Sequence, residues 1–153
     1  MKRQVISRIQ VDGPLRFDEF MEMCLYDSEA GFYGAGRVRS GEHADFVTSP
    51  EVSPWFGRLV GRWAAKVAGG DGLLVEAGAG SGSLLEPLLE EAGNEFLRAY
   101  ALEVSTTARE TISGRLPEVA TVSRWDEVPR GGCGVVIANE LLDNLPFRLV
   151  DRH

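Results

Sequence analysis

The stretch VEAGAGSGS, residues 75–83, decides the fold that we expect of this 153-residue chain. An apolar run enters a turn with three alternating glycines, and a helical pattern of leucines begins at Leu84. Glycine lets the backbone approach a ligand without a Cβ collision, and a helix N-terminus presents N–H groups that lack partners. The stretch therefore predicts a strand, a ligand-binding turn and a helix, in that order.

The rest of the chain continues the alternation of short apolar runs with helical patterns. Strands are expected near residues 73–76, 98–103, 119–123 and 135–138, and helices near 83–91 and 106–115. This alternation is typical of a parallel sheet covered by helices. The predicted fold class is therefore α/β.

The first 70 residues have a different pattern, with amphipathic helices predicted over 17–25 and from Pro54 onward. On the second helix, Trp55 and Trp63 lie on an apolar face and are predicted to anchor the core. Residues 28–51 are expected to form a long loop whose aromatic side chains favour a function. The glycines at 69–72 then suggest two domains, 1–70 and 71–153.

Composition limits the classes of function. The net charge of −7 disfavours a protein that binds nucleic acid through its phosphates. Cys24 and Cys133 match no metal-ligand spacing, so no metal site is expected. The first residues contain no apolar signal core, and no window reaches the length of a membrane span. We therefore expect a cytoplasmic protein that does not bind a membrane.

The glycine turn does not fit a dinucleotide fingerprint. G-x-G-x-x-G counted from Gly78 and Gly80 needs a third glycine where Ser83 stands. Glu103 closes the next predicted strand, about 20 residues beyond the turn, where a carboxylate can accept hydrogen bonds from both ribose hydroxyls. A nucleoside-bearing ligand is thus favoured, while a purely structural turn and a plain surface role for Glu103 remain open.

Polar residues also follow the fourth predicted strand. Asn139, Glu140 and Asp143 emerge at its carboxyl end, the edge where open α/β sheets bind ligands. If this segment is helical, the i, i+3 spacing puts both carboxylates on one face. The alternative is an ordinary helix N-terminus, with Asn139 as its cap.

Together these segments resemble the MidA-like methyltransferases, whose mitochondrial members are described as protein arginine methyltransferases. The resemblance is carried by GPLRFDEFMEMCLYDSEAG (13–31), DFVTSPEVSPWFG (45–57), the turn at 76–82, LEVS (102–105) and ANELLDNLP (138–146). It implies a Rossmann-like class I methyltransferase core that uses S-adenosyl-L-methionine and follows an N-terminal helical cap.

The resemblance also implies roles for individual residues. The group expected to hold or line the cofactor is Thr48, Ser49, Pro50, Glu51, Glu76, Gly78, Gly80, Gly82 and Glu103, with Asp126 beside the adenine. Asn139 and Glu140 are expected to face the reacting methyl. A guanidinium stays protonated, so Glu140 and Asp143 would orient the arginine of a protein substrate.

The sheet implied by the family has seven strands, whereas about four are expected here, in the order 3-2-1-4. The fourth strand would then be an exposed edge through which two copies could associate. One hypothesis is a protein arginine methyltransferase. The alternative is a truncated, non-catalytic module that binds S-adenosylmethionine or a protein partner.

Overall fold

The computed structural model describes residues 1–35, 49–68, 70, 72–131 and 134–152. These residues fall into two compact units, a sheet unit within 49–139 and a helical unit made of 1–35 and 140–152. The sheet unit contains the glycine turn and Glu103.

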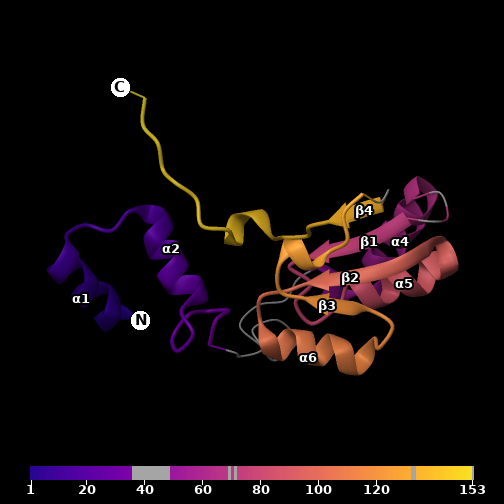
Figure 1. The fold of residues 1–153 in the computed structure, drawn as a ribbon, viewed down its shortest axis with the longest axis horizontal. Helices are drawn as coiled ribbons and strands as arrows, with labels where there is room; N and C mark the ends of the chain where they lie inside the picture. The colour runs from indigo at the N-terminus through magenta and orange to yellow at the C-terminus, as the bar shows by residue number, and fades with distance from the viewer. Residues whose placement is uncertain (36–48, 69, 71, 132–133, 153) are drawn as a thin grey trace. The chain divides into compact units, whose positions relative to one another are not determined.

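The sheet unit is built on four parallel strands, β1 (Gly72–Ala77), β2 (Phe96–Leu102), β3 (Ala120–Val122) and β4 (Gly134–Ile137). Figure 1 shows them side by side in the order β3-β2-β1-β4. In this register Glu76 lies between Ala101 of β2 and Ile137 of β4. The α/β class and the strand order predicted from the sequence are confirmed.

Helices α3 (Ser49–Val52), α4 (Pro54–Ala68), α5 (Leu85–Ala92) and α6 (Thr106–Arg115) belong to the same unit, with short 3₁₀ turns η1 (Gly93–Glu95) and η2 (Trp125–Glu127). Leu74 of β1 lies between Ala99 of β2 and Val135 of β4. All three side chains are buried in the same core cluster. Leu88 of α5 and Ile112 of α6 are fully buried in that cluster. The core therefore fixes the helices that follow β1 and β2, and with them the turns at the ends of these strands.

Helix α4 packs through its small residues. A Cβ built on Gly61 would lie 2.4 Å from the carbonyl oxygen of Leu88, so only glycine allows this approach to α5. The bulky side chains lie on the other side, with Trp55 67% and Trp63 57% exposed. The prediction that these two tryptophans anchor the core is wrong, because the close approach of α4 and α5 selects the glycine face.

The helical unit contains α1 (Lys2–Asp12), α2 (Phe17–Tyr26) and the 3₁₀ turn η3 (Leu142–Asn144). The Tyr26 hydroxyl donates to the carbonyl oxygen of Asn144 at 2.8 Å, and Arg148 Nε donates to Asp18 Oδ2 at 3.1 Å. These bonds tie the segment that follows β4 to α2, so residues distant in sequence form one unit.

The two compact units divide the chain differently from the predicted domains 1–70 and 71–153, because α4 packs with the sheet and the last residues pack with α2. The predicted boundaries remain a prediction. No helix among the described residues is long and apolar enough to cross a membrane. The suggested association through β4 is likewise still a prediction, although Val136 on that strand is 58% exposed.

Candidate functional site

The glycine turn begins where β1 ends and is fastened to the end of β2. The Gly78 N–H donates to the carbonyl oxygen of Leu102 at 2.8 Å. Gly80 has a φ of +54°, and a Cβ built there would meet no atom of the described residues within 4 Å. Positive φ favours glycine, and the open space leaves room for a ligand against the backbone. At Gly82 a Cβ would lie 3.2 Å from Ile112 Cγ1, so this glycine serves close packing against α6.

Glu103 links the two strand ends. Its Oε2 accepts the Gly80 N–H at 2.9 Å, and its Oε1 accepts the Ser105 N–H at 2.8 Å. Its own N–H donates to the carbonyl oxygen of Val122 at 2.9 Å. A carboxylate thus binds the glycine turn directly and has a defined position before any ligand arrives. The role of Glu103 toward ribose hydroxyls stays a prediction.

A second carboxyl, that of Glu76, lies in β1 just before the turn. Its side chain is buried, and Oε2 has no hydrogen-bond partner among the described residues. Burial, and secondly the negative charge of Glu103, raise the pKa of Glu76 to about 8. An isolated buried oxygen favours a donor or cation that the chain itself does not supply.

Two arginines of α6 contact the main chain of this region. Arg109 donates to the carbonyl oxygens of Glu103 and Val104 at 2.6 and 2.8 Å. Arg115 donates to the carbonyl oxygen of Ser81 at 3.1 Å and pairs with Glu86. The sequence did not predict a role for either arginine. Their acceptors are main-chain carbonyl oxygens, which every residue has, so no pattern of side chains marks such a bond.

The predicted catalytic residues follow β4 but do not share a helical face. Asn139 is half-buried in the sheet unit, whereas Glu140 and Asp143 are exposed in the helical unit. Glu140 has a φ of +52° and precedes the 3₁₀ turn η3, which contains Asp143. The Asn144 side-chain nitrogen, Nδ2, donates to the Glu140 carbonyl oxygen at 2.9 Å. The condition for the i, i+3 pair, a helix that includes both residues, is therefore not met, because the chain turns at Glu140. The catalytic roles of Asn139, Glu140 and Asp143 stay predictions.

Of the four residues at 48–51 that are expected to line the cofactor, the structure describes three. Ser49, Pro50 and Glu51 form α3, which packs on α4, and Pro50 is buried there. Thr48 lies outside the described residues. The placement of α3 beside α4 comes from packing, and its part in a cofactor pocket stays a prediction.

Asp126 lies in η2 after β3, with its carboxylate bound to Arg124. Arg124 Nε donates to Asp126 Oδ1 at 3.0 Å, and this bond lowers the pKa of the exposed Asp126 carboxyl. Among the described residues its side chain has no bond to the glycine turn. A role beside an adenine would require Asp126 to exchange or share this partner.

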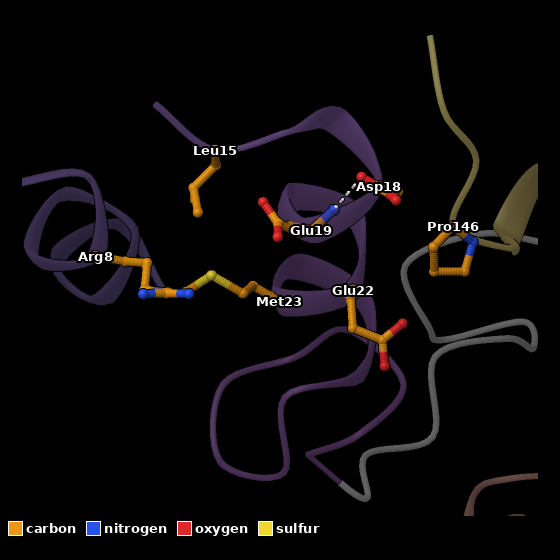
Figure 2. Close-up of a pocket in the computed structure, with 7 residues that line it drawn as sticks. All are labelled: Arg8, Leu15, Asp18, Glu19, Glu22, Met23 and Pro146. Carbon is orange, nitrogen blue, oxygen red and sulfur yellow. Dashed lines mark hydrogen bonds between the residues drawn. The ribbon is translucent and has the colours of Figure 1, made fainter. Parts of the chain in front are cut away.

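A separate hollow of about 400 Å³ opens in the helical unit. Figure 2 shows the side chains that line it, which are Arg8, Leu15, Asp18, Glu19, Glu22, Met23 and Pro146. Hydrogen bonds from Arg16, and then from Arg148, lower the pKa of Asp18 to about 2. None of the lining residues was predicted as a site residue. No group of three His, Cys, Asp or Glu side chains in the described residues is arranged to hold a metal ion.

Comparisons with known proteins agree with the geometry of the sheet unit. A family model described as "Putative S-adenosyl-L-methionine-dependent methyltransferase" matches residues 57–153. The chain is 39% identical to the protein arginine methyltransferase NDUFAF7, mitochondrial, of Bos taurus, over 58% of this chain and 21% of that protein. It is 30% identical to the Drosophila melanogaster homologue, over 99% of this chain and 42% of that protein.

A solved structure from Burkholderia thailandensis, bound to S-adenosyl-homocysteine, superposes with a TM-score of 0.77 at 30% identity. The match covers 95% of this chain and 41% of that one. The chain thus spans about a fifth to two fifths of the length of the relatives that it matches.

The comparisons correct one prediction. The cytoplasmic location was inferred from the absence of an apolar signal core, which tests only for secretion. The relatives from Bos taurus, Drosophila melanogaster and Caenorhabditis elegans are named as mitochondrial proteins, which contradicts that inference. The family model covers the sheet unit from Gly57, within α4, onward, and the solved relative repeats its fold. The chain therefore belongs to the MidA-like family of S-adenosyl-L-methionine-dependent methyltransferases.

Proposed function

We propose that the chain binds S-adenosylmethionine at the carboxyl ends of β1 and β2 and takes part in methyl transfer to an arginine of a protein substrate. One observation carries the proposal: the Glu103 carboxylate lies 2.9 Å from the Gly80 amide, beside the open face of the glycine turn. A carboxylate at this place can accept hydrogen bonds from ribose hydroxyls. The solved relative with S-adenosyl-homocysteine supports this choice of ligand.

The residues at the turn fit the chemistry of this cofactor. S-adenosylmethionine carries an ammonium group, a sulfonium and two ribose hydroxyls, all of which suit carboxylates. Glu76 Oε2 is buried without a partner among the described residues, and a bound ammonium or hydroxyl would satisfy it. Gly78 and Gly82 also have positive φ, which gives the turn its tight path around Gly80. We assign Glu103 to the ribose hydroxyls and Glu76 to the ammonium group of the cofactor.

When bound, the cofactor would supply an electrophilic methyl group, and the neutral thioether sulfur that this methyl leaves behind needs no acid. The chain's task is then to position the acceptor arginine. We assign this role to Asn139, Glu140 and Asp143, which come after β4 in the sequence. The exposed carboxylates of Glu140 and Asp143 can bind a guanidinium, which remains protonated at neutral pH. The names of the relatives, protein arginine methyltransferases, support arginine as the acceptor.

Calorimetric titration with S-adenosyl-homocysteine tests the binding step. We expect the wild-type chain to bind and Gly80→Ala to bind at least about tenfold more weakly, because the added methyl fills the ligand's space and disfavours the positive φ. Gly93→Ala is the matched control. Gly93 has a φ of +58° and an equally open Cβ position, but it lies at the end of α5. No binding by the wild-type chain would overturn the proposal.

Transfer of an isotope-labelled methyl group to an arginine-rich protein tests the second step. Label in methylarginine after hydrolysis supports the proposed reaction, and Glu140→Gln is expected to reduce it. Binding of S-adenosyl-homocysteine without any transfer would instead favour the non-catalytic module.

A further inference from the structure

Glu103 is held through its main chain as well as through its side chain. Arg109 Nη1 donates to the carbonyl oxygen of Glu103 at 2.6 Å and to that of Val104 at 2.8 Å. Arg109 Nη2 donates to Thr106 Oγ1 at 3.1 Å. One guanidinium thus bridges the end of β2 and the first residue of α6.

These bonds limit the direction in which the Glu103 side chain can point. The Glu103 N–H is bound to Val122 and its C=O to Arg109, so the peptide groups on both sides of its Cα are held. With the backbone held, the carboxylate reaches the Gly80 N–H with one oxygen and the Ser105 N–H with the other. The guanidinium therefore acts on the carboxylate through the backbone, without touching it.

Helix stability does not explain an arginine at this position. Ser105 caps α6, so Arg109 lies at the end of the first helical turn. The helix dipole disfavours cations there, and the first turn contains no acidic residue that would pair with one. The side chain instead reaches back beyond the helix, to the carbonyl oxygens of Glu103 and Val104, which precede the cap.

We infer that Arg109 is a positioning residue for the cofactor site, which orients Glu103 toward the ribose by clamping the β2–α6 connection. This inference rests on the proposed function. Arg109 contacts no cofactor atom in this scheme, and its effect should appear only in interactions that pass through Glu103.

The test compares Arg109→Met with wild type in titrations with S-adenosyl-homocysteine and with its analogue lacking both ribose hydroxyls. Methionine removes every donor and has a similar helix propensity. We expect roughly tenfold weaker binding of S-adenosyl-homocysteine, the effect of one impaired charged hydrogen bond. Affinity for the dihydroxyl-free analogue should stay within about twofold of the wild-type value, as for independent sites. Arg109→Lys offers a single amine, so its affinity for S-adenosyl-homocysteine should lie between those of wild type and Arg109→Met.

Arg130→Met is the control, because Arg130 is exposed and has no hydrogen bond among the described residues. It should bind both compounds as wild type does. If Arg109→Met bound both compounds more weakly by the same factor, the inference would be overturned. A general loosening of the site would lower both affinities whether or not the ribose hydroxyls are present. Unchanged binding of both would overturn it as well.

A second measurement separates this inference from the proposed function. In the ligand-free protein, hydrogen exchange of the Gly80 and Ser105 amides reports directly on the Glu103 carboxylate. Faster exchange at both amides in Arg109→Met, but not in Arg130→Met, supports the clamp even if the wild-type chain fails to bind S-adenosyl-homocysteine. Unchanged exchange would refute the clamp whether or not the ligand binds.

Discussion

The Gly80 amide donates to Glu103 Oε2 at 2.9 Å, which joins the turn after β1 to the residue after β2. The same carboxylate accepts the Ser105 amide through its other oxygen. A charge-assisted bond of this kind is stronger than one between neutral groups. The ligand-free chain therefore already holds the turn in a defined shape, and a ribose would meet a carboxylate whose orientation is set.

Replacing Glu103 by Gln should weaken S-adenosyl-homocysteine binding by about 10- to 100-fold, the range for a hydrogen bond to a charged group. The amide keeps the size of the side chain but loses the charge and one acceptor. Calorimetric titration measures the change. Glu110→Gln on the exposed surface of α6 removes the same charge and should leave affinity unaltered. Equal affinities of Glu103→Gln and wild type would exclude Glu103 as the ribose ligand.

The pKa of about 8 for Glu76 predicts a pH-dependent stability. The folded state binds the proton more tightly than the unfolded chain, whose carboxyl titrates near 4.5. The free energy of unfolding should therefore fall as pH rises from about 4.5 to about 8, and this contribution should level off above that range. Glu76→Gln removes the titrating group, so its free energy of unfolding at pH 8 should exceed that of wild type by about 2 kcal/mol or more.

Urea unfolding of both proteins between pH 5 and 8 measures this difference. Exposed Glu95→Gln is the control and should follow wild type throughout. A constant gap between Glu76→Gln and wild type across the range would show that Glu76 does not titrate there.

The positive φ of Glu140 predicts that glycine is more stable than alanine at this position. A left-handed conformation costs a residue with a Cβ about 1 kcal/mol or more. Glu140→Gly should therefore unfold at higher urea concentration than Glu140→Ala, although both lose the carboxylate. If the alanine variant proves the more stable, the chain does not turn at Glu140 in solution.

Two Gly→Ala substitutions, one at the contact between α4 and α5 and one in α6, should change the stability of the fold in opposite directions. At Gly61 the new methyl would collide with the Leu88 carbonyl oxygen, and overpacking of this kind costs about 1–3 kcal/mol. Gly114 in α6 has no atom of the described residues within 4 Å of its Cβ position, so alanine should stabilise the helix by up to about 1 kcal/mol. Thermal unfolding of both variants checks the signs, and a neutral Gly61→Ala would argue against the close helix contact.

Local patterns predicted the sheet unit well. The helix over 106–115 agrees with α6, because Ser105 provides its cap and the apolar runs on either side end in turns. The strand order was also correct, but it came from the family resemblance, since residue patterns alone do not determine which strands are neighbours. Glu103 was predicted as a ribose ligand from its distance beyond the glycine turn, whereas its bond to the Gly80 amide was not predicted.

The sequence was less informative where packing or main-chain bonding decides the outcome. The apolar face of α4 suggested buried tryptophans, yet Gly57 and Gly61 allow a closer approach to α5 and turn the bulky face outward. Arg109 was missed because its partners are carbonyl oxygens, which every residue has. The turn at Glu140 was missed because a left-handed glutamate has no sequence signature.

The outward face of α4 has a spectroscopic consequence. The chain contains three tryptophans, and Trp55, Trp63 and Trp125 are 67, 57 and 54% exposed. Their indole emission should already be close to that of an aqueous fluorophore in the native protein, so denaturation would shift the wavelength maximum little. A marked blue shift on mixing with another macromolecule would then report that indole rings on the folded protein have become covered.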